Sequence, residues 1–184
     1  MGKVIVAGVG PIEGLGASLC VRFAEEGLHV IASGRTQSKL EKVVQRIESE
    51  GGSAEAFVAD STDEAATEAL FDKAGTLLFT GASASLRGRA NFGAFNSSKG
   101  ALRNLAQAMA KEYASDGIHV GHVVVDGPIG GEKIIKGIPE YAEKLGQEGM
   151  IDLKGITDAF SFLFHQPKNA WTFELDVRTS KEKW

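Results

Sequence analysis

The chain has 184 residues, 43% of them hydrophobic and 24% charged, with a formal net charge of −4. This length and composition are those of one ordinary globular domain with a substantial core. The acidic balance, with both signs interspersed, predicts no basic surface for nucleic acid or for an anionic membrane. No apolar run reaches the length of a membrane span and no secretion signal is recognisable, which together with a single cysteine, Cys20, favours a cytoplasmic protein.

The beginning of the chain predicts a buried strand, a glycine-rich turn and a helix. An unbroken apolar run predicts the strand at 3–8, and apolar residues at helical spacing follow the turn. A helix that opens after such a turn has unpaired backbone N–H groups at its N-terminus, and these favour a phosphate. The alternative is a merely tight turn between strand and helix. The glycines of the turn are Gly10, Gly14 and Gly16.

Strands and helices alternate along the rest of the chain. Strands are predicted at 29–33, 54–59, 76–80, 119–125 and 170–177, and helices at 37–50, 61–74, 91–115, 141–146 and 157–165. Such alternation predicts a Rossmann-like, doubly wound parallel sheet in a three-layer α/β/α single domain over residues 1–184. Ligands of such sheets bind at the carboxyl ends of the strands, where the glycine turn lies. The long helix at 91–115 is expected to bury Leu102, Leu105, Ala106, Met109 and Tyr113.

The order of the motifs resembles that of the short-chain dehydrogenase/reductase family. The likeness rests on Gly10-x3-Gly14-x-Gly16 after the first strand, on Asp60 after the third, and on Phe95-Asn96-Ser97-Ser98-Lys99 in the long helix. It runs over nearly the whole chain. The resemblance implies a nicotinamide cofactor, a small carbonyl or alcohol substrate and a possible homo-oligomer.

The resemblance also implies a role for each matching position. The glycine turn would line the cofactor's pyrophosphate, and the residues after the third strand would meet the adenine. Lys99 would bond the nicotinamide ribose, and the Pro-Ile pair after the fifth strand would flank the carboxamide. The implied cofactor-binding residues are Gly10, Ile12, Gly14, Leu15, Gly16, Arg35, Asp60, Ser61, Lys99, Pro128 and Ile129.

The end of the second strand indicates which nicotinamide cofactor is bound. A carboxylate there would accept hydrogen bonds from a ribose 2′-OH, whereas an arginine suits a 2′-phosphate. This strand ends in Ser33-Gly34-Arg35-Thr36, with no acid. Arg35 can bond a phosphate with two N–H groups at once. We therefore expect NADP(H) rather than NAD(H), and the alternative for Arg35 is a solvated turn residue.

The sequence departs from the family at its catalytic residues. The family's catalytic acid is a tyrosine four residues before the lysine, and this chain has Phe95 there, which carries no proton to give. The family's serine falls on Ala82, with Ser83 one place later. Ser83 can polarise a carbonyl if the loop shifts, although a loop serine is more often an ordinary turn residue. The candidate catalytic set is therefore Lys99, Ser83 and, at the tyrosine position, Phe95.

A second departure is a deletion at the 75/76 junction. Roughly fifty residues, one strand and one crossover helix, are missing relative to the family. Either the strand at 76–80 pairs with the first strand, or an edge is left open, which is costly because buried backbone groups go unpaired. The remaining alternative is that the sequence joins two segments across residues that are not recorded.

Three hypotheses about function follow. The first is a weak or atypical NADP(H)-dependent oxidoreductase, in which Ser83 or water held by Lys99 supplies the proton. The second is an inactive cofactor-binding protein that serves as a sensor or a partner subunit; a third is a shortened chain without a function of its own. No metal site is expected, because His29, His119 and His122 lie on or beside predicted strands without companions at ligand spacing.

Overall fold

The computed structural model describes residues 2–60, 63 and 76–182. These residues belong to two compact units, Met1–Ala74 and Gly75–Trp184, which we call unit 1 and unit 2. The predicted helix at 61–74 lies outside the described residues except for Asp63. The expectations of a single domain and of a particular strand pairing at the 75/76 junction stay predictions.

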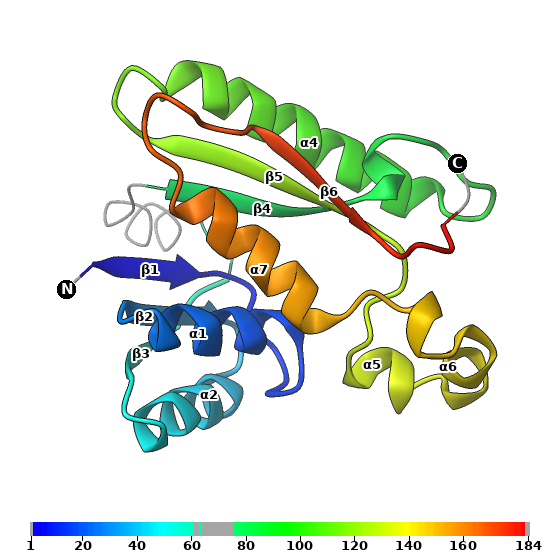
Figure 1. Cartoon of the computed structure of the whole chain (residues 1–184), viewed down its shortest axis with the longest axis horizontal. Coiled ribbons are helices and arrows are strands. Elements are labelled where there is room, and N and C mark those ends of the chain that lie inside the picture. Colours follow the sequence, from blue (N-terminus) through cyan, green and yellow to red (C-terminus); the bar gives the residue numbers. More distant parts are fainter. Residues whose placement is uncertain (1, 61–62, 64–75, 183–184) are drawn as a thin grey trace. The chain divides into compact units, whose positions relative to one another are not determined.

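Unit 1 is a parallel three-stranded sheet with its helices in sequence alternation (Figure 1). The strands run in the order β1-β2-β3, and Val4 pairs with Val30, which pairs with Ala54. The helices α1 and α2 pack against each other and against the strands, as expected of βαβ units. The elements are β1 (Lys3–Val6), α1 (Leu15–Glu25), β2 (His29–Gly34), α2 (Gln37–Ser49) and β3 (Ser53–Val58).

Unit 2 is a second parallel sheet, in the order β4-β5-β6, with a long helix on each face (Figure 1). Successive residues of β5 point to opposite faces. The Gly121 face meets Leu163 of α7, while the His122 side chain joins a polar cluster with α4. The elements are β4 (Thr76–Ala82), the 3-10 turn η1 (Ser83–Ser85), α4 (Gly93–Glu112), β5 (His119–Asp126), α5 (Glu132–Ile135), α6 (Pro139–Leu145), the 3-10 turn η2 (Gln147–Gly149), α7 (Leu153–Phe164) and β6 (Glu174–Arg178).

The predicted strands and the long helix are confirmed, but the predicted buried face of α4 is partly wrong. Of the residues expected there, Ala106 is fully buried, whereas Leu105 is 53% exposed. Lys99 and Arg103 take sheet-facing positions of α4 instead, because their polar ends find acceptors on β4 and β6. The helix therefore meets its sheet through two cationic side chains and a narrow apolar stripe.

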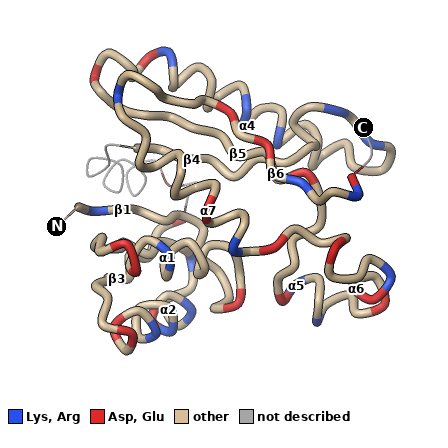
Figure 2. Tube along the Cα trace, viewed as in Figure 1, with Lys and Arg blue, Asp and Glu red and all other residues tan. Residues whose placement is uncertain are grey.

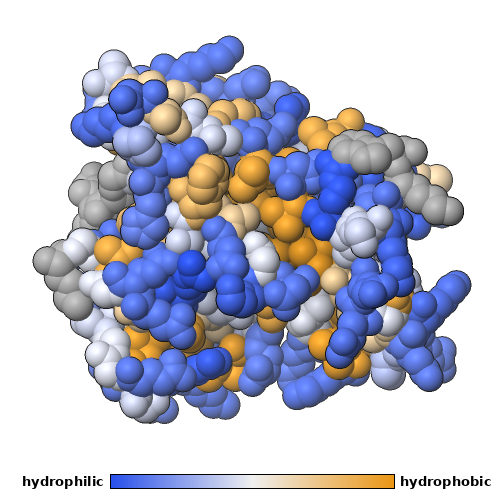
Figure 3. All heavy atoms as spheres, viewed as in Figure 1, coloured by the Kyte–Doolittle hydropathy of each residue, from blue (hydrophilic) through white to orange (hydrophobic). Residues whose placement is uncertain are grey.

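The surface carries charges of both signs, as the composition predicts. Lys and Arg alternate with Asp and Glu along α2 and α6 (Figure 2). In the space-filling view, both hydrophilic and apolar residues reach the surface (Figure 3). Among the helices that the structure describes, none combines the length and apolarity needed to cross a membrane.

Candidate cofactor and active site

The glycine turn of unit 1 opens α1 without a side-chain cap. Gly14 is the N-cap residue, its N–H donates to the Pro11 carbonyl at 2.9 Å, and the first turn of α1 contains no acidic residue. The N–H groups that begin a helix have no partners inside it. A Cβ added at Gly10 would meet no atom within 4 Å, so the turn borders open space at this residue. Such a turn suits an anion.

The turn is fixed against the end of β2 by backbone contacts. The N–H of Val9 donates to the Ser33 carbonyl at 2.8 Å. A Cβ added at Gly34 would lie 2.5 Å from the Val9 carbonyl oxygen, and one at Gly16 would lie 3.1 Å from Val9 Cα. Gly34 thus requires glycine for the close backbone approach, and Gly16 favours it. Sequence reasoning missed Gly34, although a glycine that ends a buried strand beside a glycine turn is a usable signal.

Arg35 follows directly on β2 and is exposed. Among the residues that the structure describes, Arg35 forms no ion pair. Asp60 is also exposed and lies beyond the end of β3, where its carbonyl accepts the N–H of Asp63 at 2.9 Å. Ser61 lies outside the described residues. Unit 1 brings most of its predicted residues to the carboxyl edge of one sheet: Gly10, Ile12, Gly14, Leu15, Gly16, Arg35 and Asp60.

These features of unit 1 fit a phosphate-bearing nucleotide. The helix donors lack a protein cap, the glycines remove side chains from the approach, and an exposed guanidinium stands at the neighbouring strand end. Cys20 is not a rival reactive group. It is fully buried on α1, and burial raises the pKa of its thiol to about 12, so the thiolate does not form near neutral pH.

Lys99 lies on α4 and is directed at β4 of unit 2. Its Nζ donates to the Thr80 carbonyl at 3.0 Å, and burial lowers its pKa from the ordinary value. Phe95 lies one helical turn earlier and is 46% exposed. The phenyl ring has no hydrogen-bonding group, so the position cannot supply a proton.

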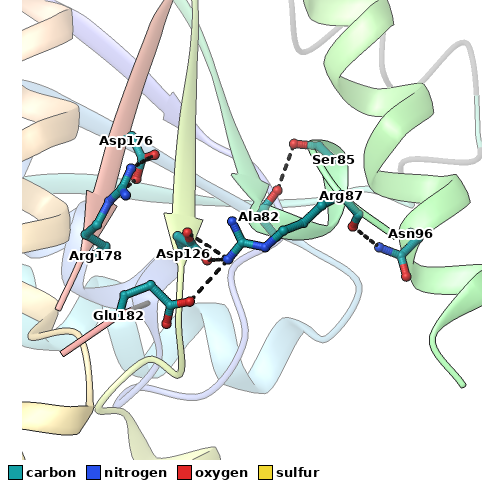
Figure 4. A network of polar contacts seen from close by, with 8 residues as sticks. All are labelled: Ala82, Ser85, Arg87, Asn96, Asp126, Asp176, Arg178 and Glu182. Atoms are coloured by element: carbon teal, nitrogen blue, oxygen red, sulfur yellow. Dashed lines mark hydrogen bonds and ion pairs between the residues drawn. The ribbon is translucent and has the colours of Figure 1, made fainter. Parts of the chain in front are cut away.

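Ser83 begins the 3-10 turn after β4 and is half-buried. Its carbonyl accepts the N–H groups of Leu86 and Arg87 at 2.9 and 3.1 Å. Asn96 of α4 holds the same loop: its Nδ2 donates to the Ala84 carbonyl at 3.1 Å. The same Nδ2 donates to the Arg87 carbonyl at 2.7 Å (Figure 4). The loop that presents Ser83 is therefore fastened to the helix that carries Lys99. This role of Asn96 was not predicted.

A buried carboxylate ends β5 just before the predicted carboxamide-binding pair. The Asp126 side chain is 3% exposed and accepts from Arg87 Nη2 at 2.9 and 3.1 Å, while Arg87 also contacts Glu182 at 3.2 Å (Figure 4). Ile151 holds Pro128 and Ile129 in place. Its N–H donates to the Pro128 carbonyl at 2.8 Å, and it forms a parallel bridge with Ile129. Sequence reasoning missed this ion pair, for which an aspartate at the end of a buried strand is the only local signal.

A further polar cluster lies beneath α4. Glu174 of β6 accepts from Arg103 Nε at 2.6 Å and Nη2 at 2.9 Å, and its Oε2 lies 3.0 Å from His122 Nδ1. The hydrogen bond from Arg103 lowers the pKa of Glu174, and burial lowers the pKa of His122, which is 0% exposed. An ionised carboxylate beside a neutral imidazole places the imidazole proton on Nδ1. His122 is thus a core histidine, as predicted, but it is tied to a charged network.

Neither unit gathers metal ligands in its described part. Among residues 2–60, 63 and 76–182, no three His, Cys, Asp or Glu side chains lie close enough together to hold a metal ion.

Comparison with known sequences decides the family. The profile described as short chain dehydrogenase matches residues 3–75 and 72–129. The chain belongs to the short chain dehydrogenase family. The two matched stretches meet at the predicted junction of the shortened chain.

Curated relatives match only over a short stretch. The 3beta-hydroxysteroid dehydrogenase 1 of Eggerthella lenta is 39% identical over 74 residues, which are 40% of this chain and 28% of the relative. The fatty acyl-CoA reductase of Acinetobacter baylyi is 41% identical over 69 residues, which are 38% of this chain and 23% of the relative. The match thus covers about a quarter of the length of these relatives.

Solved structures match over nearly the whole chain. A short-chain dehydrogenase from Rhodopseudomonas palustris has a TM-score of 0.74 and 27% identity, covering 96% of this chain and 98% of its own. The closed form of serine dehydrogenase complexed with NADP+ has a TM-score of 0.81 and 16% identity, covering 99% and 96%. A metagenomic short-chain oxidoreductase in complex with NADP has a TM-score of 0.74 and 18% identity, covering 97% of each chain. These likenesses confirm the predicted Rossmann-like α/β fold.

Proposed function

We propose that the chain binds NADP(H) and catalyses, weakly, the oxidoreduction of a small carbonyl or alcohol. The observation that carries the proposal is the uncapped start of α1 behind the open glycine turn, with the exposed Arg35 at the next strand end. Two of the similar structures are described as complexes with NADP+ or NADP, which supports the same cofactor here. When bound, the nicotinamide ring supplies the hydride chemistry.

In unit 1, each residue has a binding role. The N–H groups that begin α1 would bond the pyrophosphate, with Ile12 and Leu15 against it. Arg35 would bond the 2′-phosphate through its guanidinium fork, which is free of ion pairs among the described residues. Asp60 and Ser61 would meet the adenine.

In unit 2, Lys99 is the principal group. An ammonium has three donors, of which the Thr80 carbonyl takes one, so donors remain for the nicotinamide ribose hydroxyls. The loop held by Asn96 would present Ser83 to a substrate carbonyl, and Pro128 and Ile129 would flank the carboxamide. Because Phe95 offers no proton, Ser83 or water held by Lys99 has to supply it. Loss of a dedicated acid typically costs about 10²–10⁴-fold in rate.

The same proposal treats residues 1–184 as a single NAD(P)-binding domain that is about one strand and one helix short at the 75/76 junction, or that joins two recorded segments. The separate family matches at 3–75 and 72–129 support a break there. We further propose a cytoplasmic protein that can form a homo-oligomer. The exposed apolar side chains of α4, Phe95 and Leu105, support self-association. Light scattering after size-exclusion chromatography tests the oligomeric state.

The direct test is a titration of the purified chain with NADPH and with NADH, followed by nicotinamide fluorescence. Micromolar binding of NADPH and much weaker binding of NADH is the expected result. Binding of neither cofactor would contradict the proposal as a whole.

A second candidate function is an inactive NADP(H)-binding protein that acts as a sensor or partner subunit. Phe95 and Ala82, which replace the family's reactive side chains, favour it. The discriminating variant is Phe95→Tyr. A large gain of carbonyl reductase activity supports the enzyme, whereas unchanged inactivity with intact cofactor binding supports the sensor.

A further inference from the structure

The face that α4 turns to its sheet carries two cations one helical turn apart. Lys99 reaches the Thr80 carbonyl on β4 at 3.0 Å, and Arg103 reaches the Glu174 carboxylate on β6 at 2.6 and 2.9 Å. Leu105, which would pack there in an ordinary amphipathic helix, is 53% exposed. Two polar anchors therefore hold α4 on its sheet beside the buried Ala106.

Glu174 is the centre of the second anchor. Its Oε1 accepts from Arg103 Nη2, and its Oε2 accepts from Arg103 Nε and lies 3.0 Å from His122 Nδ1. Bidentate pairing of this kind fixes orientation as well as distance, because the guanidinium and carboxylate planes must align. A shift of α4 along or around its axis would break both bonds from Arg103.

His122 contacts Glu174 from the sheet side, and its ring is closely enclosed by its neighbours. Its ring is fully buried, is stacked with Phe173 at a centroid distance of 6.4 Å, and fills the space above Gly81, where an added Cβ would overlap the ring. The charged groups that act on it are Glu174 from β6 and Arg103 and Lys99 from α4, while its β4 neighbours, Phe79 and Gly81, carry no charge. The ring therefore presents Nδ1 to the carboxylate from a fixed place.

We propose that Arg103, Glu174 and His122 are positioning residues for Lys99. They lock the next turn of the same helix to β6 and β5, and so keep Lys99 Nζ within hydrogen-bonding distance of Thr80 and directed toward a bound nicotinamide ribose. The inference rests on the proposed cofactor role of Lys99. It adds a requirement for cofactor binding beyond Lys99 itself, because the ion pair of Arg103 with Glu174 must be intact.

A double-mutant cycle tests this role. The variants are Glu174→Gln, Lys99→Met and the double variant, and the ligands are NADPH and adenosine 2′,5′-bisphosphate, which lacks the nicotinamide ribose. If Glu174 acts through Lys99, Glu174→Gln weakens NADPH binding by about 10-fold in the wild-type background and has little effect in the Lys99→Met background. Binding of adenosine 2′,5′-bisphosphate stays unchanged in every variant.

Two further variants serve as a control and as a second test. Asp176→Asn removes a carboxylate from the same strand, where it pairs with Arg178 rather than with α4, and should leave NADPH binding unchanged (Figure 4). Arg103→Lys keeps the charge without the fork; it should reproduce the loss in part, and it replaces Glu174→Gln if that variant does not fold.

The outcomes separate the two proposals. A wild-type chain that binds neither ligand contradicts the proposed function, and the positioning role with it. A wild-type chain that binds both, with equal losses on Glu174→Gln in both backgrounds or equal losses for both ligands, contradicts the positioning role alone.

Discussion

Unit 1 builds most of its predicted site from backbone, with Arg35 as the one predicted cation, whereas the predicted site of unit 2 depends mainly on charged side chains. In unit 1 the donors are N–H groups at the start of α1, the open space lies at Gly10, and Gly16 and Gly34 allow the turn to pack closely on its neighbours. In unit 2 Lys99 bonds a strand carbonyl, while the ion pair of Arg87 with the buried Asp126 carboxylate fastens the end of β5. Backbone sites depend on sterics and change little with pH; side-chain sites depend on charge. The two units should therefore respond to different substitutions and conditions.

The largest effect is expected from restoring an acid to unit 2. Phe95→Tyr should raise carbonyl reductase activity by about 10²–10⁴-fold, because a phenol one turn before Lys99 has its pKa lowered by the ammonium and can transfer a proton. The measurement is NADPH consumption with a panel of small carbonyl compounds.

The matched control is Phe92→Tyr, which changes a similarly exposed phenylalanine just before α4. It should leave the activity unchanged. An equal gain in both variants would argue against a specific role of position 95.

The charge of Arg35 in unit 1 should determine the preference for NADPH over NADH. Arg35→Ala should weaken NADPH binding by roughly 10- to 100-fold, the worth of charge-assisted hydrogen bonds, and leave NADH binding unchanged. Fluorescence titration measures both. Arg46→Ala on α2, where the arginine pairs with Glu50, is the control and should have no effect. If Arg35→Ala weakens both cofactors alike, the 2′-phosphate assignment is wrong.

Steric changes in unit 1 should separate folding from binding. Gly34→Ala places a Cβ 2.5 Å from the Val9 carbonyl and should lower the free energy of unfolding by about 1–3 kcal/mol. Gly10→Ala meets no atom within 4 Å, so it should leave stability unchanged and weaken NADPH binding. Urea unfolding and the same titration distinguish the two. Equal stability of the two variants would contradict the packing of the turn on β2.

The smallest effect is expected in the pH dependence of the free energy of unfolding, through His122 of unit 2. Burial lowers the pKa of His122 below its ordinary value of 6.5, so the unfolded chain binds this proton first as the pH falls. The free energy of unfolding should decline from about pH 6.5 downward, by at most about 1.4 kcal/mol per pH unit, and level off below the folded pKa. Glu174, whose pKa is lowered from 4.5, adds a loss only at more acidic pH.

His122→Asn provides the control for the pH dependence. Its side-chain N–H can still donate to Glu174, but the side chain does not titrate, so the decline near pH 6 should disappear. Urea unfolding at a series of pH values measures the free energy of unfolding of the wild type and of the variant. An unchanged decline in the variant would assign it to another group.

Several parts of the fold could be predicted from residues that are neighbours in the sequence. The apolar run at Val4–Val6 and the glycines that follow predicted β1 and the start of α1, because period and turn chemistry are local. The same reasoning misplaced Leu105. Periodicity shows which residues of a helix are apolar, but it does not show that Lys99 and Arg103 find acceptors on the sheet and take the inner positions.

By itself, the sequence determined the alternation of strands and helices, the glycine turn and the family. Each of these depends on residue type and short spacing. Only the tertiary structure decided that Glu174 meets Arg103, 71 residues away, and that Asp126 meets Arg87, 39 residues away. Such pairs form when parallel strands and their crossover helix bring distant side chains together, and no local pattern in the chain encodes which partners will meet.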